Sequence, residues 1–139
     1  MIIVDTNIIS DVIGPRPTPS VFDWLRNQPV DDIWTTAITA AELRAGVAAL
    51  IDGRRKRMLG EAVEQALYVD FSGRILPFDD AASVAYASIS AARRRLGRNV
   101  GELDMQIAAI AVVRGATVAT RNVTHFDESG VNLVNPWEA

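Results

Sequence analysis

Three acidic side chains, Asp5, Glu42 and Asp104, are widely separated in the sequence, yet two of them border strongly apolar segments. Asp5 directly follows the run Ile-Ile-Val at 2–4, and Asp104 lies near the start of "LDMQIAAIAVVR" at 103–114. A charge in such surroundings is costly unless a cation or a hydrogen bond compensates it. Carboxylates that meet at one place would raise one another's pKa, and they select hard divalent cations such as Mg²⁺ or Mn²⁺. Such an ion polarises a phosphodiester and lowers the pKa of a water molecule, so the chemistry to test is metal-assisted phosphodiester hydrolysis.

A fourth oxygen donor is expected in the segment "VATRN" at 118–122. Its Val-Ala pair is typical of a buried strand, Thr120 ends that strand, and Asn122 follows two residues later. The amide oxygen of Asn122 can coordinate a cation or a water molecule, but it supplies no charge. An ordinary polar turn is the alternative interpretation, and Asp127 could replace Asn122 only if the turn folds back.

Hydrophobic periodicity predicts strands and helices that alternate along the chain. The predicted strands are 2–4, 33–36, 74–76, 117–120 and 131–134. The predicted helices are 7–13, 19–28, 39–50, 54–69, 80–95 and 103–114, the second carrying Phe22, Trp24 and Leu25 inward. Strands that alternate with helices pair in parallel, with the helices covering both faces of the sheet. We therefore predict a three-layer α/β sandwich with a five-stranded parallel sheet flanked by helices, in which the strand order is left open.

This architecture would bring the oxygen donors to one edge of the sheet, because ligands bind beyond the carboxyl ends of parallel strands. Asp5 follows the first strand, and Asn122 follows the fourth. Glu42 and Asp104 lie in the first turns of helices that begin at the same edge. All four side chains are therefore expected to meet there.

Each acid also has a purely structural interpretation. "TAAE" at 39–42 fits a capping box in which Thr39 is the cap and Glu42 reaches back to its amide. Asp104 in a first turn favours the helix dipole. Asp5 could form an Asx turn or cap the helix that follows it.

The composition indicates one globular domain, residues 1–139, without cysteine and with a single histidine, His125. The net charge of −3 does not suggest a nucleic-acid binder held by a diffuse positive field. Positive charge is nevertheless clustered in "RRKR" at 54–57 and "RRRLGR" at 93–98, either as solvated helix ends or as contacts for phosphates. No signal peptide or membrane-spanning stretch is recognised, so a cytoplasmic protein without a membrane partner is expected.

Four motifs together resemble the PIN-domain nucleases, and among them the VapC-type toxins of bacterial toxin–antitoxin pairs. They are "VDTN" at 4–7, "TAAELRAG" at 39–46, "ELDMQIAA" at 102–109 and "VATRN" at 118–122. The segments "GRILPFD" at 73–79 and "NPWE" at 135–138 are most similar to the FitB-like subgroup. The resemblance covers essentially the whole chain.

The resemblance implies an endoribonuclease dependent on Mg²⁺ or Mn²⁺, with Asp5 and Asp104 as metal ligands. Glu42 would be the third acid, orienting the attacking water or a second ion, and Asn122 would occupy the fourth acidic position. Thr6, Asn7 and Thr120 would support these groups by hydrogen bonds. The resemblance also implies a homodimer, an RNA substrate, and inhibition by a cognate VapB-type antitoxin that carries the complex to operator DNA.

Other functions are also consistent with parts of the sequence. Because Asn122 leaves the acidic set incomplete, the chain could be a weakly active or inactive subunit that acts mainly as the antitoxin's partner on DNA. An aspartyl-nucleophile phosphatase would want an acid two residues after Asp5, where Asn7 stands. A serine hydrolase would want a "GxSxG" turn, and a nucleotide-dependent enzyme a glycine-rich phosphate loop; the sequence has neither.

Overall fold

The computed structural model describes residues 1–97, 101–126 and 129–138. Within them, five parallel strands form one sheet in the order β3-β2-β1-β4-β5. The strands are β1 (Ile2–Val4), β2 (Ile33–Thr36), β3 (Ile75–Leu76), β4 (Thr117–Ala119) and β5 (Asn132–Val134). The longer helices are α1 (Thr6–Ile13), α2 (Pro19–Arg26), α3 (Ala37–Ala48), α4 (Arg54–Gln65), α5 (Asp80–Arg95) and α6 (Glu102–Arg114). The predicted parallel α/β sandwich is confirmed.

The central strand β1 is the point at which the strand order reverses. On one side β1 pairs with β2, with Ile2 opposite Ile33, and on the other it pairs with β4, with Ile2 opposite Thr117. The chain first builds outward through β2 and β3 and then crosses to the other side through β4 and β5. Such a switch point is where open α/β sheets place their ligands, just beyond the carboxyl ends of the two diverging strands.

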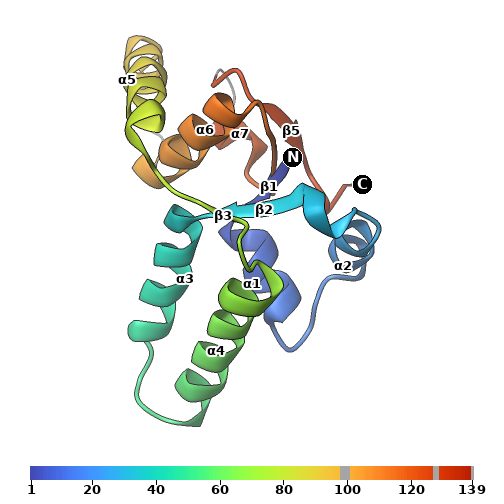
Figure 1. Ribbon diagram of the computed structural model, residues 1–139. Coiled ribbons are helices and arrows are strands. Elements are labelled where there is room, and N and C mark those ends of the chain that lie inside the picture. Colours follow the sequence, from blue (N-terminus) through green and yellow to red (C-terminus); the bar gives the residue numbers. More distant parts are fainter. Residues whose placement is uncertain (98–100, 127–128, 139) are drawn as a thin grey trace.

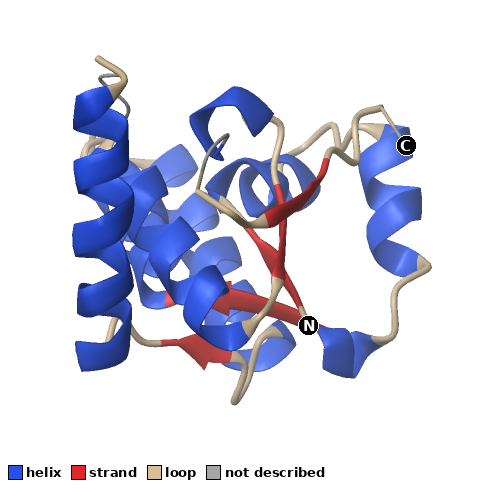
Figure 2. Ribbon diagram, turned by 90° about the horizontal axis from the view of Figure 1, so that it is seen from above, coloured by secondary structure: helices blue, strands red, loops and turns tan. Residues whose placement is uncertain are grey.

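Side chains that alternate along the strands divide the core into two halves. Ile3 and Val118 face one half, which is covered by α5 and α6. Val4 and Ala119 face the other half, which is covered by α1, α3 and α4. Figure 1 shows α5 and α6 on one side of the strands and α1, α3 and α4 on the other, and Figure 2 shows the strands in the middle of the molecule. The sheet is therefore the buried middle layer.

Several local predictions differ from the structure. Phe22 is exposed rather than inward, because α2 buries Val21 instead, with Trp24 and Leu25 half-buried against the core. The helix predicted over 54–69 loses its α-helical hydrogen bonding after Gln65 and continues as a π-helical turn, Ala66–Asp70. A short 3₁₀ turn, Val30–Asp32, precedes β2.

The end of α6 is one place where glycine is required. Gly115 adopts the left-handed conformation, with φ of 62°, and so closes the helix immediately before β4.

No helix within 1–97, 101–126 and 129–138 is both long enough and apolar enough to cross a membrane.

Candidate active site

Asp5 lies between the central strand and α1, directly after Val4 and directly before Thr6. Its side chain is 3% exposed. One carboxylate oxygen, Oδ1, accepts the backbone N–H of Ile8 at 3.2 Å, so Asp5 caps α1, as the structural interpretation of this residue predicted. The other oxygen, Oδ2, accepts the hydroxyl of Thr120 at 2.6 Å across the β1–β4 pair. Capping fixes the position of this carboxylate and leaves it at the edge of the sheet.

The surroundings of Asp5 oppose its ionisation. The pKa of this carboxyl is raised from 3.8 to about 6: burial is the largest cause and the negative charge of Asp104 adds to it, while the hydrogen bonds from Thr120 and Ile8 oppose it. Asp5 is therefore mostly ionised at neutral pH, but at a cost that a nearby cation would relieve.

Glu42 reaches the same region from α3, although not by the capping box that the sequence suggested. The helix starts at Ala37 with Thr36 as its cap, whose hydroxyl accepts the Thr39 N–H at 3.1 Å. Thr39 is fully buried, and Glu42 lies in the second turn. With no backbone amide to cap, the Glu42 carboxylate accepts the hydroxyl of Thr6 at 2.9 Å. Burial, and then the charge of Asp104, raise the pKa of Glu42, while the Thr6 hydrogen bond lowers it.

Asp104 lies in the first turn of α6, as predicted, with 23% of its side chain exposed. Its Oδ2 is 2.8 Å from Nδ1 of His125. The sequence predicted no role for His125, but residues Val123–Phe126 form a short helix, α7, that carries it to Asp104. The signal for this helix is weak, a pair of apolar residues three positions apart, of which Phe126 is buried.

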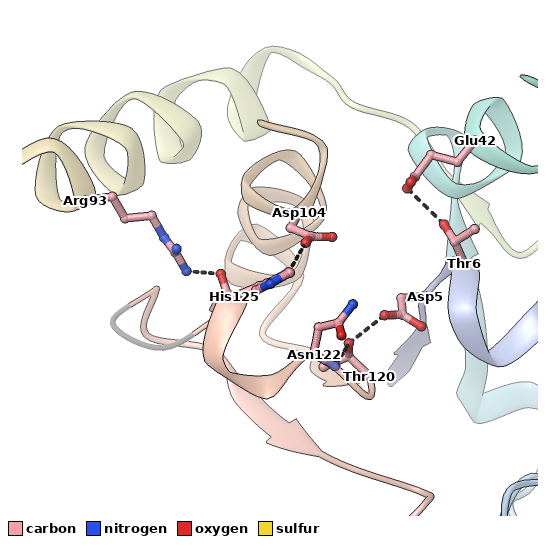
Figure 3. A network of polar contacts seen from close by, with 8 residues as sticks. All are labelled: Asp5, Thr6, Glu42, Arg93, Asp104, Thr120, Asn122 and His125. Atoms are coloured by element: carbon pink, nitrogen blue, oxygen red, sulfur yellow. Dashed lines mark hydrogen bonds and ion pairs between the residues drawn. The ribbon is translucent and has the colours of Figure 1, made fainter. Parts of the chain in front are cut away.

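Asn122 is linked to Asp5 through Thr120. The backbone N–H of Asn122 donates to the Thr120 hydroxyl oxygen at 3.0 Å, and that hydroxyl in turn donates to Asp5. Figure 3 shows Asp5, Thr120 and Asn122 in one group, with Asp104 and His125 on one side of it and Glu42 with Thr6 on the other. The alternative donor Asp127 lies outside the described residues.

The structure therefore gathers Asp5, Glu42, Asp104 and Asn122 at the carboxyl edge of the sheet, close enough that Asp104 influences both other acids. A PIN-domain family model matches residues 2–128. The chain belongs to the PIN-domain family.

Curated relatives match this PIN domain over nearly its whole length. It is 42% identical over 137 residues to Toxin FitB from Neisseria gonorrhoeae, covering 99% of each chain. It is 39% identical over 138 residues to VapC ribonuclease Y4jK from Sinorhizobium fredii, again covering 99% of each chain.

Solved structures show the same fold. One, FitAB bound to an IR36 DNA fragment, superposes with a TM-score of 0.90 at 41% identity and covers 99% of this chain and 96% of that one. A second, VapBC2 from Rickettsia felis bound to a DNA fragment from its promoter, gives a TM-score of 0.79 at 25% identity, over 97% of this chain and 98% of that one.

The oxygen-rich donor set of this PIN domain fits a hard divalent cation. Among the described residues, no three His, Cys, Asp or Glu side chains gather closely enough to hold an ion by themselves. Mg²⁺ does not require such a cage, because it usually takes one or two carboxylates and keeps several waters. The Asp5 and Asp104 carboxylates, which repel each other's charge, would be the two that hold such an ion.

The basic clusters at 54–57 and 93–98 have different surroundings in the structure. "RRKR" begins α4, and Figure 1 shows this end of α4 at the tip of the α3–α4 hairpin, away from the sheet. In the second cluster Arg93 is 2% exposed, and its guanidinium donates to the backbone carbonyl of His125, so it is neither a solvated helix end nor a phosphate contact. Arg94 and Arg95 are exposed, and Arg98 lies outside the described residues.

Proposed function

We propose that this PIN domain is the toxin component of a toxin–antitoxin pair and a divalent-metal-dependent endoribonuclease that hydrolyses RNA phosphodiester bonds. One observation of the molecule carries the proposal: Asp5, Glu42 and Asp104 lie at the carboxyl edge of the sheet, where burial raises the pKa of Asp5 and Glu42 and the charge of Asp104 adds to that effect. A cation bound at this edge would relieve the repulsion among these carboxylates. The names of the relatives, a toxin and a ribonuclease, support the same reaction class.

In this proposal Asp5 and Asp104 hold the ion. When bound, a divalent cation polarises the scissile phosphoryl group and lowers the pKa of the attacking water. Thr120 keeps the Asp5 carboxylate in one orientation through its short hydrogen bond. His125 does the same for Asp104 from α7.

The two remaining groups act on the substrate side. Glu42 has a raised pKa, which makes its carboxylate a better proton acceptor, and Thr6 holds it in place, so it takes a proton from the attacking water. Asn122 supplies a neutral amide that orients water or a phosphate oxygen without adding a fourth negative charge. The backbone N–H of Asn7 helps to lower the pKa of Asp5, and its side chain, exposed on α1 next to Thr6, hydrogen-bonds the RNA.

We further propose a VapB-type antitoxin as the partner, with operator DNA bound only through the complex, and a homodimer in the cytoplasm. The support is the likeness to FitAB and to VapBC2, both solved with DNA, together with the net charge of −3. A protein with this charge needs another chain to provide the extended positive surface that duplex DNA requires.

Purified chain freed of any antitoxin tests the reaction. Cleavage of structured and single-stranded RNAs is expected with Mg²⁺ or Mn²⁺, and none with EDTA. Asp104→Asn should lose the metal-dependent cleavage with its circular dichroism unchanged, whereas Arg26→Ala, an exposed change on α2, should retain it. Cleavage that persists in EDTA or in Asp104→Asn would overturn the proposed chemistry.

A second candidate is a weakly active or inactive subunit whose main role is to complete the antitoxin's DNA complex. It is favoured by Asn122 at the fourth acidic position and by the lack, among the described residues, of a ready-made group of three metal ligands. This candidate predicts that the purified chain cleaves no RNA with either ion but still raises its antitoxin's affinity for operator DNA.

A further inference from the structure

A groove opens beside the candidate active site, with a volume of about 610 Å³. Its lining residues are Asn7, Ser10, Asp11, Arg121, Asn122 and Trp137. Two of them tie the groove to the site: Asn122 donates its backbone N–H to Thr120, the hydrogen-bond partner of Asp5, and Asn7 follows Thr6, the partner of Glu42. An RNA strand that crosses the acids would therefore continue into this groove.

Arg121 and Trp137 line one side of the groove and form a platform, with the guanidinium over the indole ring. The central carbon of the Arg121 guanidinium lies 5.4 Å from the centroid of the Trp137 ring. Trp137 is half-buried against the core, and its backbone N–H donates to Oδ1 of Asn135 at 3.0 Å. Arg121 is exposed and immediately precedes Asn122. The indole is thus fixed by the core, and the exposed guanidinium over it is accessible to an incoming group.

The opposite wall offers short polar side chains. Asn7 and Ser10 are exposed on α1 and are three residues apart, so they lie on the same face of the helix. Asp11 brings a negative charge, but both of its carboxylate oxygens accept hydrogen bonds from Thr18, at 2.9 Å from the backbone N–H and 2.7 Å from the hydroxyl. This wall suits the donors and acceptors of a base edge, and its carboxylate disfavours a phosphate, which leaves Arg121 as the phosphate contact.

We propose that this groove binds one unpaired nucleotide of single-stranded RNA, adjacent to the scissile phosphate. Its base stacks on the Arg121–Trp137 platform, and its phosphate accepts hydrogen bonds from the edge of the Arg121 guanidinium. A guanidinium can do both, because its faces stack while its N–H groups point outward in the plane. Bases of single-stranded RNA bind in this way to aromatic rings and arginine planes. The proposal rests on the proposed ribonuclease function, since it assigns a subsite of that reaction.

Binding is measured separately from cleavage so that the two proposals can fail independently. Fluorescence anisotropy of a short labelled single-stranded RNA is recorded in an Asp104→Asn background, which does not cut the probe. Arg121→Ala and Trp137→Leu should each weaken binding roughly tenfold, as expected for loss of one stacked base. Trp137→Phe, which keeps an aromatic ring, should restore most of the affinity even if the Leu variant is less stable.

The salt dependence separates the two halves of the platform. Arg121→Ala should reduce the slope of log affinity against log salt by about 0.7, the value for one phosphate contact on a single strand. Trp137→Leu should leave that slope unchanged. The matched control is Arg26→Ala, which removes an arginine 5.8 Å above the Phe22 ring on α2, outside this groove, and should change neither affinity nor slope.

The outcomes distinguish the subsite from the reaction. One outcome is that the wild type cleaves RNA, while the Arg121 and Trp137 variants keep their RNA affinity in the Asp104→Asn background and their KM in the otherwise wild-type chain. In that case the subsite is wrong and the ribonuclease assignment stands. If the variants lose affinity as expected but the wild type never cleaves, the subsite stands and the ribonuclease assignment fails. Loss of affinity in Arg26→Ala equal to that in Arg121→Ala would mean that general charge, not the platform, binds RNA, and would overturn the subsite.

Discussion

The polar groups of the site fall into two sets that are built differently. The first, the strand-end set, is Asp5 with Thr120: both are buried, at 3% and 0% exposed, and their hydrogen bond joins the ends of β1 and β4. The second, the helix set, is Glu42 and Asp104, which are half-buried on α3 and α6. Each of these acids is held by a side-chain contact, Glu42 by Thr6 and Asp104 by His125 (Figure 3).

This difference indicates that the two sets have different roles in binding a ligand. The strand-end set is fixed by backbone pairing and by the cap of α1, so its geometry exists before any ligand arrives. The helix set can adjust its side chains at little cost, because it is partly solvated. One carboxylate is pre-formed, and the second can adjust its position to complete the binding site. Such a pair is suited to bind an ion first and a substrate phosphate afterwards.

The largest expected effect comes from changing one acid of each set. Asp5→Asn should lower the rate of RNA cleavage by more than the roughly 10- to 100-fold that loss of an outer hydrogen-bond partner costs, because it removes a fixed ligand. Glu42→Gln should lower kcat with a smaller loss of Mn²⁺ affinity, because Glu42 moves a proton rather than holding the ion. Calorimetric Mn²⁺ titration checks this, and an unaltered affinity in Asp5→Asn would refute the division between the sets.

The second effect concerns stability, measured by urea denaturation in EDTA. The folded state raises the pKa of Asp5 from 3.8 to about 6, so the unfolded chain loses this proton first and stability falls as the pH rises from about 4 to about 6. Asp5→Asn removes that loss. Relative to the wild type, the free energy of unfolding of the variant should therefore increase by up to about 3 kcal/mol between pH ~4 and pH ~7.5, which is the value that corresponds to a pKa difference of this size.

A stabilised but inactive Asp5→Asn variant would be the mark of a functional carboxylate kept at a cost. As a control, saturating Mn²⁺ should stabilise the wild type more than the variant, because only the wild type retains the buried ligand. If the variant and the wild type differ in free energy of unfolding by the same amount at both ends of this pH range, burial of the Asp5 charge does not destabilise the fold.

The strand-end set could be predicted from the sequence, and the reason is local. An acid directly after an apolar strand, and a Thr at the end of another, are positioned by the two-residue period and parallel pairing alone. Even so, the pairing of β1 with β4 that joins Asp5 to Thr120 depends on the strand order, which no local pattern carries.

The helix set was predicted less well, because helix ends depend on tertiary contacts. The sequence favoured Thr39 as a cap, but Thr36 takes that role because β2 delivers it in extended geometry, with ψ of 159°. That displacement of the cap by three residues freed Glu42 to bind Thr6 instead of the backbone. The contact of His125 with Asp104 also escaped prediction, since it needs α7 to fold against α6.

A smaller effect should separate the supporting threonines of the two sets. Thr120→Val removes the hydroxyl that donates to Asp5 and accepts the backbone N–H of Asn122. The rate of cleavage should therefore fall roughly 10- to 100-fold. Thr6→Val removes one contact to a half-exposed Glu42, which water can replace, so its loss should be several-fold smaller. Thr120→Ser and Thr6→Ser keep the hydroxyl groups and serve as controls. Equal losses in both Val variants would mean that the helix set is as rigid as the strand-end set.

The smallest expected effect lies at Asn122, which is hydrogen-bonded to Thr120 of the strand-end set but brings no charge. Asn122→Ala should weaken cleavage less than about tenfold, below the range for a group that orients a ligand. Asn122→Asp should do the opposite for the metal: a further carboxylate raises the pKa of Asp5 in the free protein and strengthens the attraction for a cation, so Mn²⁺ affinity should increase. Calorimetry of both variants measures this. If Asn122→Asp leaves the Mn²⁺ affinity unchanged, the fourth position does not face the ion.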